Sequence, residues 1–349
     1  MDTEINQNII FAHIAGLTIE SKEDLYYIFS KSTLKRYVDI VDIDTITNKI
    51  IEDKNMEILF SKFEYYSVRS KDKDLSQTET KMASTKAKNL EKKMFQYWKV
   101  KMEYYINKIT SNSTKKIILI GYISFFKNHR ININLNINPK FFIKVDYTQH
   151  AKSIIKYNLE NSTEDIINGD FDLNYLDIDF LIKKRIQLQN IYSKINYYQF
   201  SIASIINILE LKSQIQIPSI LYYASFIKYD KKIPILNNII YTYTEEWLAL
   251  SAILTSEDNL NKIEDISTNV EKGINKNGNI YIRLSKDQIK KFNNTGYLYE
   301  ITNTETFLPA PTKNNIYKYF SIKSIKINRV LEIDNVFNQI KQLKINILS

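Results

Sequence analysis

The chain has 349 residues, 44% of them apolar, with a formal net charge of +9 and no cysteine. The lack of cysteine excludes disulfides, thiolate metal sites and a cysteine nucleophile, and three histidines (His13, His129 and His150) argue against a histidine-rich zinc site. No apolar run approaches the ~18–20 residues of a membrane span, and the acidic, polar start MDTEINQN is unlike a signal peptide. We therefore expect a soluble protein of a reducing compartment, without membrane association.

The basic charge balance could steer the protein toward nucleic acid. Its lysines form no dense run, however, and its tyrosines are scattered rather than arranged as an RNA-stacking motif. A solvated lysine-rich surface is the favoured interpretation, so dedicated nucleic-acid binding is not favoured.

The first part of the chain alternates apolar strands with helices. Strands are expected at 8–15, 37–43, 115–123 and 140–147, and helices at 22–30, 94–109 and 176–198. The polar segment 69–93 is predicted to be a long loop that grades into a helix. Such alternation implies parallel strands joined by right-handed crossovers, and so an α/β domain over residues 1–205.

The pattern changes after a bridging helix at 201–212. Short aromatic strands follow at 220–226, 239–244, 279–284, 296–301 and 317–322. Two helices interrupt them, at 245–254 and 334–344. This mixture predicts a smaller α+β accessory domain over residues 213–349.

One strand-to-helix connection has the spacing of a phosphate-binding loop. That loop has the form G-x-x-x-x-G-K-[ST], in which glycines let backbone N–H groups surround a phosphate and the lysine neutralises its charge. Here the stretch reads Gly16-Leu17-Thr18-Ile19-Glu20-Ser21-Lys22-Glu23. The first glycine and the lysine stand in register, between an apolar strand and a helix.

The same stretch departs from the pattern at three positions. Ser21 replaces the second glycine, and is expected to strain a turn that needs unusual backbone angles. Ile19 stands where a further glycine is common, and Glu23 replaces the hydroxyl that binds Mg²⁺. Glu20 adds another negative charge. By the pattern alone, a plain connection with a solvated Lys22 is favoured.

The order of elements strengthens the comparison. Residues 8 to about 200 resemble the small P-loop kinase-like proteins, of adenylate-kinase and nucleoside-kinase type, found in giant DNA viruses of protists. The matching segments are the loop with its following Leu25, then VDIVDIDTI (38–46), IILIG (117–121), FFIKVDYTQHAKSIIKYNL (141–159) and IKKRIQLQ (182–189). The resemblance implies a three-layer α/β fold with its ligand at the carboxyl ends of a parallel sheet.

The resemblance also implies roles for individual residues. Gly16, Thr18, Ser21 and Lys22 would contact phosphate, and Asp42 or Asp44 would hold Mg²⁺ or the acceptor. Lys183, Lys184 and Arg185 would be lid cations that stabilise the transferring group, with Lys183 and Lys184 also on phosphate. ATP with Mg²⁺ would be the ligand, or else there is no cofactor.

Simpler interpretations of these residues are favoured. Asp44 is expected to cap the helix beginning TITNKII, and the basic triplet is expected to lie on a solvated helix face. His129 and His150 have no evident carboxylate partner and are expected at the surface.

The second part resembles a domain appended to similar viral and phage proteins. The segments that match are LYYASF (221–226), IYTYTEEWLALSA (240–252) and TGYLYEI (295–301). That opening is similar to ADP-ribosyltransferase folds, which bind a nicotinamide cofactor. Tyr223 and Ala224 stand where such folds have histidine and glycine, and the tyrosines here are expected to be sheet and core residues.

Three functions follow from these patterns. The leading hypothesis is a catalytically impaired kinase-like protein that senses nucleotide or acts as a scaffold for a protein partner. The alternative is an active ATP-dependent phosphotransferase, and the third is ADP-ribose transfer by the second domain. A viral origin would place the protein in the host cytoplasm or the virion.

Overall fold

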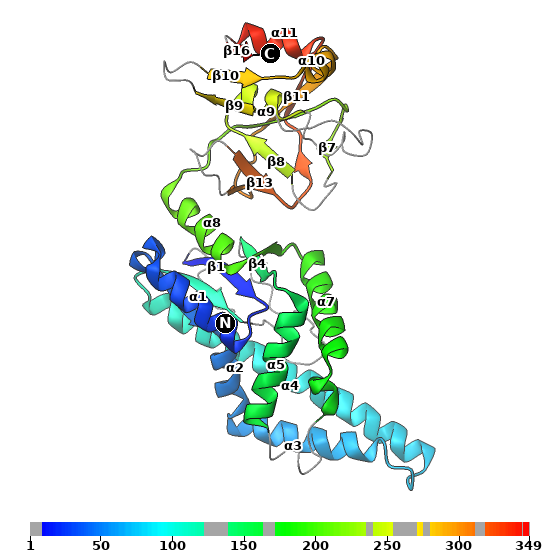
Figure 1. Cartoon of the computed structure of the whole chain (residues 1–349). Coiled ribbons are helices and arrows are strands. Elements are labelled where there is room, and N and C mark those ends of the chain that lie inside the picture. The colour runs from blue at the N-terminus through cyan, green and yellow to red at the C-terminus, as the bar shows by residue number, and fades with distance from the viewer. Residues whose placement is uncertain are drawn as a thin grey trace. The chain divides into compact units, whose positions relative to one another are not determined.

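A computed structural model describes residues 9–121, 139–162, 172–234, 240–253, 271–274, 280–310, 318–343 and 345–348 (Figure 1). The chain forms two compact units, Met1–Ile206 and Asn207–Ser349. The division falls inside helix α8 (Ile202–Gln214), as do the predicted boundaries at 205 and 213. Among the described helices, none combines the length and apolar character needed to span a membrane.

The first unit is built on a five-stranded parallel sheet with helices, which confirms the predicted α/β class. Its strands are β1 (Ile10–Ala15), β2 (Val38–Asp42), β3 (Lys116–Ile120), β4 (Lys140–Ile143) and β5 (Tyr198–Phe200). They lie in the order β2-β3-β1-β4-β5, and every neighbouring pair is parallel. β1 is central and buried along its whole length. It pairs with β3 on one side and with β4 on the other.

The fifth strand was not predicted, because its three residues follow directly on a helix. The expected helix 176–198 ends early: α7 stops at Lys194, and Asn196 adopts a left-handed φ of 65°. Asparagine tolerates that conformation, which reverses the chain direction. The chain then pairs Tyr198 with Phe141 of β4.

Apart from α7, the helices predicted in the first unit are longer than expected. They are α1 (Ile19–Lys31), α2 (Ile43–Ile51), α3 (Lys54–Arg69), α4 (Gln77–Asn112), α5 (Tyr147–Asn161) and α7 (Ile178–Lys194). The segment 69–93 was predicted to be a long loop that grades into a helix; the helix is confirmed, but the long loop is wrong, because α4 already begins at Gln77. Ser76 and Glu79 form a capping box that starts α4, and only a short turn separates it from α3. The two helices pack side by side as a hairpin (Figure 1).

One core cluster joins this hairpin and α2 to the sheet. Met94, Trp98, Met102 and Ile106 recur at every fourth residue of α4, and all are buried. They pack with residues of β1, β3 and α2. Four-residue spacing keeps side chains on one helix face, so this half of α4 is held by the sheet.

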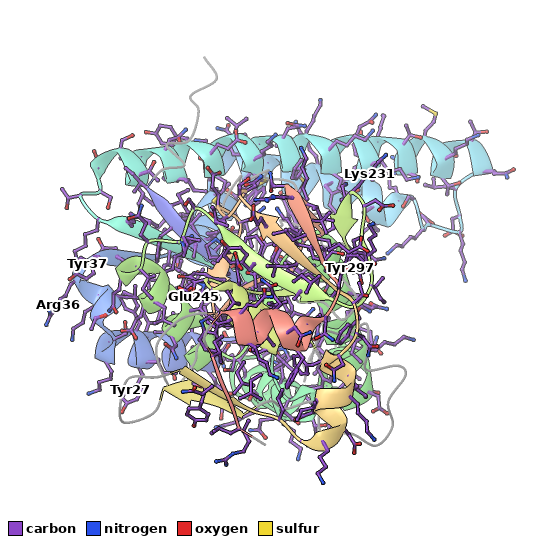
Figure 2. All side chains as sticks on the ribbon, turned by 90° about the horizontal axis from the view of Figure 1, so that it is seen from above. Tyr27, Arg36, Tyr37, Lys231, Glu245 and Tyr297 are labelled. Atoms are coloured by element: carbon purple, nitrogen blue, oxygen red, sulfur yellow. The ribbon has the colours of Figure 1, made fainter. Side chains whose placement is uncertain are left out.

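The surface near α1 carries aromatic and basic side chains. Tyr27 of α1 and Tyr37, which follows a short 3₁₀ turn (Thr33–Arg36), are both exposed. Figure 2 shows them, with Arg36, pointing away from the ribbon. These residues therefore add little to the packing of the sheet.

The second unit contains a separate antiparallel sheet of six strands. Its order is β12-β13-β8-β6-β11-β15, and smaller sheets have the orders β16-β10-β9 and β14-β7. The strands of the large sheet are β6 (Leu221–Ser225), β8 (Ile240–Tyr243), β11 (Gly296–Ile301), β12 (Leu308–Pro309), β13 (Lys318–Ser321) and β15 (Arg329–Ile333). The others are β7 (Lys232–Ile233), β9 (Glu271–Ile274), β10 (Ile280–Arg283), β14 (Ile325–Lys326) and β16 (Asn346–Leu348).

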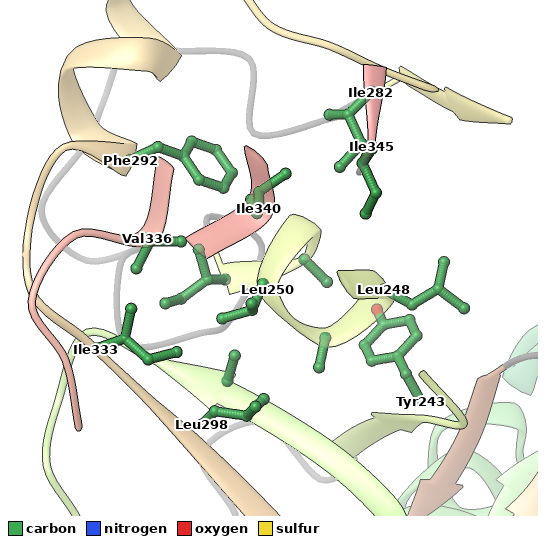
Figure 3. Packing of buried hydrophobic residues seen from close by; sticks show 14 of the residues in the cluster. Tyr243, Leu248, Leu250, Ile282, Phe292, Leu298, Ile333, Val336, Ile340 and Ile345 are labelled. Atoms are coloured by element: carbon green, nitrogen blue, oxygen red, sulfur yellow. The ribbon is translucent and has the colours of Figure 1, made fainter. Parts of the chain in front are cut away.

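In the described part of this unit, three helices accompany these strands: α9 (Glu246–Ser251), α10 (Lys286–Phe292) and α11 (Val336–Gln342). The prediction of two helices missed α10, whose start is marked by a Ser285–Gln288 capping box. Val336 and Ile340 of α11 pack with Leu298 and Ile333 of the sheet (Figure 3). The unit thus has an apolar core of its own.

Candidate phosphate-loop site

The connection between β1 and α1 is only three residues long, Gly16 to Thr18. Gly16 has a φ of 83°, and a Cβ built on it would lie 2.9 Å from the ring of Phe142. Glycine is thus needed here both for its backbone angle and for space. Ser21, by contrast, lies in the first turn of α1 and has no left-handed φ, so the expected strain at this residue is wrong.

The N-terminus of α1 is closed by its own side chains. Thr18 is the N-cap, and its Oγ1 accepts a hydrogen bond from the Ser21 N–H at 3.2 Å. In return, the Ser21 Oγ accepts from the Thr18 N–H at 2.6 Å. The Lys22 N–H donates to the Thr18 carbonyl at 2.9 Å, as in any helix. A phosphate would need these N–H groups as donors, but all three are already used.

Lys22 is held by two carboxylates at the end of β2. Its Nζ lies 2.8 and 3.0 Å from the two oxygens of Asp42 and 2.8 Å from one oxygen of Asp44. The side chains are largely buried, with 16%, 19% and 32% of Lys22, Asp42 and Asp44 exposed. The lysine is therefore paired rather than solvated. With one positive and two negative charges, the cluster is negative as a whole.

These contacts change how Lys22 titrates. Burial alone would lower its pKa, but hydrogen bonds to Asp42 and Asp44 outweigh burial and raise the pKa above that of an ordinary lysine. Burial, followed by the charge of Asp42, also raises the pKa of Tyr26. Tyr26 was not predicted as a site residue, although its position four residues after Lys22 places both on one face of α1.

The two aspartates are fixed by different contacts. Asp42, not Asp44, is the N-cap of α2, because its side chain accepts from the Asp44 N–H at 2.9 Å. The helix begins at Ile43, two residues earlier than predicted. The Asp44 carboxylate faces the backbone of Gly121, where a Cβ would lie 2.7 Å from its oxygen. Gly121 follows directly on β3 and has a φ of 109°, a backbone angle that favours glycine. Its lack of a side chain leaves room for the Asp44 carboxylate.

Arg185 connects the carboxyl ends of β1 and β4 through hydrogen bonds. Its side chain is buried, and its guanidinium donates to the carbonyl of Gly16 at 2.8 Å and to that of Ile143 at 2.5 Å. The same group lies 4.3 Å from the centre of the Phe142 ring. Open α/β sheets bind ligands where the chain leaves neighbouring strands in opposite directions, which here is between β1 and β4. Arg185 bridges those two ends.

The other two predicted lid cations lie elsewhere on α7. Lys183 is exposed, and the Lys184 ammonium lies 5.3 Å from the centre of the Phe180 ring. The structure therefore brings together Gly16, Thr18, Ser21, Lys22, Asp42, Asp44 and Arg185. It does not bring Lys183 or Lys184 to the Lys22 cluster.

A buried histidine lies beside this region in the middle of β1. His13 Nε2 is 3.0 Å from the Gly121 carbonyl, to which it must donate, so Nδ1 accepts from the Tyr197 hydroxyl at 2.7 Å. Burial, more than any charge, lowers the pKa of His13 to about 3. His150 is half-buried rather than at the surface, and burial and the Arg185 charge lower its pKa to about 4. His129 lies outside the described residues.

In the second unit, the residues compared with a nicotinamide site belong to the core. Tyr223 and Ala224 of β6 are buried in two apolar clusters. Tyr243 and Tyr299 are also buried, and Tyr222, Trp247 and Tyr297 pack against the same clusters. The prediction of sheet and core aromatics is confirmed.

Within the described part of the chain, no group of three or more His, Cys, Asp or Glu side chains is placed to hold a metal ion. Asp42 and Asp44, which the resemblance assigns to Mg²⁺ or the acceptor, both accept hydrogen bonds from the Lys22 ammonium. Comparisons with protein-family models, with curated proteins and with solved structures found no match to this chain.

Proposed function

We propose that the first unit is a degenerate P-loop kinase-like domain of three layers that acts as a protein interaction module and does not transfer phosphoryl groups. The observation that carries the proposal is the contact of Lys22 with both Asp42 and Asp44. The positive charge of Lys22, which would neutralise a phosphate, is already exceeded by the two negative charges of these carboxylates. A nucleotide phosphate entering here would meet like charges, which cost several kcal/mol when they are juxtaposed.

Two further contacts support this proposal. The capping box of Thr18 and Ser21 uses the N–H groups of the helix N-terminus. Arg185, the cation expected on the transferring group, is committed to the carbonyls of Gly16 and Ile143. The loop follows the central strand, as expected for a domain of kinase-like ancestry. Its N–H donors, Lys22 and Arg185 are instead used in contacts within the protein.

Thermal unfolding with millimolar MgATP, MgGTP and NAD tests the proposal. A ligand at one hundred times its Kd would stabilise the protein by about 2.7 kcal/mol. We expect no change of Tm with any of the three. Saturable stabilisation by MgATP that disappears in Lys22→Ala, together with phosphoryl transfer, would establish the kinase alternative. Stabilisation without turnover would instead assign nucleotide sensing.

A charge-neutral variant tests the reason for the closure. In the double variant Asp42→Asn and Asp44→Asn, Lys22 loses its charged partners, and asparagine at 42 can still cap α2. We expect this variant to gain a weak stabilisation by millimolar MgATP through the freed charge of Lys22, since the Thr18–Ser21 cap still occupies the N–H groups. The matched control is Asp39→Asn on the same strand, whose exposed carboxylate pairs with Lys115 at 3.1 Å and should leave the response unchanged.

A further inference from the structure

The six-stranded sheet of the second unit has an open edge at β15. Among the described strands, β15 pairs only with β11. Residues 329–332 are all exposed, and the apolar side chains of Val330 and Leu331 are 38% and 36% exposed. An exposed edge offers a row of backbone donors and acceptors to another chain, and proteins usually protect it with free charges or proline.

The charges on β15 protect it little, because they are paired within the same unit. Arg329 pairs with Glu300 of β11 at 3.4 Å, and Glu332 pairs with Lys228 at 3.2 Å. Apart from these two paired side chains, the exposed part of β15 consists of its extended backbone and the apolar side chains of Val330 and Leu331. This arrangement favours pairing with another strand over repelling it.

A cavity of about 370 Å³ lies beside this edge, between β15 and α11. Leu298 and Leu331 line it from the sheet. Because Val336 and Ile340 of α11 point into the core (Figure 3), the helix offers its amide side chains, such as Asn338 and Gln342, to the cavity. A strand added to β15 would point alternate side chains to this face of the sheet.

The lining of the cavity is acidic. It includes Glu246, Asp334 and Glu332, of which Glu332 pairs with Lys228 outside the lining, together with four amide side chains, and no lysine or arginine. The surroundings are negative as well: burial first, and then the charges of Glu246, Glu300 and Glu245, raise the pKa of Tyr222. In a chain with a net charge of +9, this is a local reversal of sign.

We propose that the β15 edge binds an extended, positively charged peptide segment by strand addition, with one lysine or arginine side chain in the cavity lined by Glu246 and Asp334. Main-chain hydrogen bonds to the edge would supply affinity, and the cavity would select the side chain. A second copy of this chain fits less well, because β15 itself (Arg-Val-Leu-Glu-Ile) carries no net charge to match the cavity.

Fluorescence anisotropy on the full chain tests the proposal with three labelled hexapeptides. They are Val-Lys-Val-Lys-Val-Lys, its glutamate counterpart, and the lysine peptide N-methylated at every residue after the first, so that it has no amide N–H to donate along either edge. We expect the lysine peptide to bind at least tenfold more tightly than either of the others. The double variant Glu246→Gln and Asp334→Asn should weaken that binding at least fivefold, while Glu305→Gln, an exposed carboxylate outside the lining, should not.

Three outcomes would overturn the proposal. Equal binding of the methylated and unmethylated lysine peptides would mean plain charge attraction, without strand addition. Equal binding by the protein and its double variant would remove the cavity from recognition. A dimer by mass photometry that dissociates in Leu331→Lys would assign the edge to a second copy of the chain.

Discussion

His13 is the residue whose chemistry depends most on its surroundings. It lies in the central strand, is fully buried, and has one ring nitrogen donating to Gly121 and the other accepting from Tyr197. Nε2 carries the proton of the neutral ring because it must donate to the Gly121 carbonyl, and burial disfavours a second proton on Nδ1. Its surroundings therefore select one tautomer and exclude the cation.

This predicts a defined pH dependence of stability. The folded ring stays neutral down to a pH of about 3, whereas an unfolded histidine takes up a proton below about 6.5. The unfolded state therefore binds more protons between these values, and the free energy of unfolding falls as the pH falls. Denaturant titrations of His13→Gln at pH 6.5 and 4.5 should show a pH-dependent loss about 2.3 kcal/mol smaller than in the unmodified chain.

Tyr197→Phe separates titration from packing. This variant loses the hydroxyl that donates to His13 but keeps the imidazole of His13, which is the group that titrates. We therefore expect a lower free energy of unfolding at both pH values, with most of its pH dependence retained. If His13→Gln leaves the difference between the two pH values unchanged, His13 does not carry it.

Helix α1 illustrates how local side chains decide the form of a loop. Ser21 looks like a substituted glycine when the sequence is aligned to a phosphate loop, yet it sits in a helical turn and caps it together with Thr18. Serine is favoured at helix N-termini, so a capped helical turn stands where a phosphate loop would have a glycine-rich turn. The loop is thus shorter, and the helix starts before Lys22.

Ser21→Gly should therefore destabilise the first unit. The change removes the reciprocal cap and places glycine inside a helix, costing about 1–2 kcal/mol in the free energy of unfolding. Chemical denaturation measures this, with Glu23→Thr as the control, since Glu23 is exposed and its replacement should change the free energy by no more than about 0.5 kcal/mol. MgATP binding in the combined variant would show that the loop can still form a phosphate nest.

Some of these elements could be predicted and others could not. The apolar runs at 8–15, 115–123 and 140–147 predict buried parallel strands. The ion pairs of Lys22 with Asp42 and Asp44 were not predicted, because a solvated Lys22 was the favoured interpretation. The start of α4 was missed although Ser76 and Glu79 spell a capping box. The contact of Arg185 with Gly16 joins residues 169 positions apart, and no local pattern encodes it.

At the scale of the whole molecule, each unit carries its own core. The two large clusters of the second unit draw every member from residue 217 onward. We expect a fragment of residues 215–349 to unfold cooperatively by circular dichroism. Leu298→Ala, in a nearly fully buried site, should destabilise both the fragment and the full chain, by about 2–5 kcal/mol. A fragment without a cooperative transition would contradict this.

The long helix α4 connects parts of the first unit with unequal stability. From residue 94 onward it buries Met94, Trp98 and Met102, whereas the buried residues of the half before this point are two alanines, Ala83 and Ala87. Apolar burial resists local unfolding, so the backbone hydrogen bonds of the first half open at a lower free energy than those over the sheet. The outer turns of the hairpin can therefore fray, and their amide protons exchange with water, while the sheet and the Lys22 cluster remain folded.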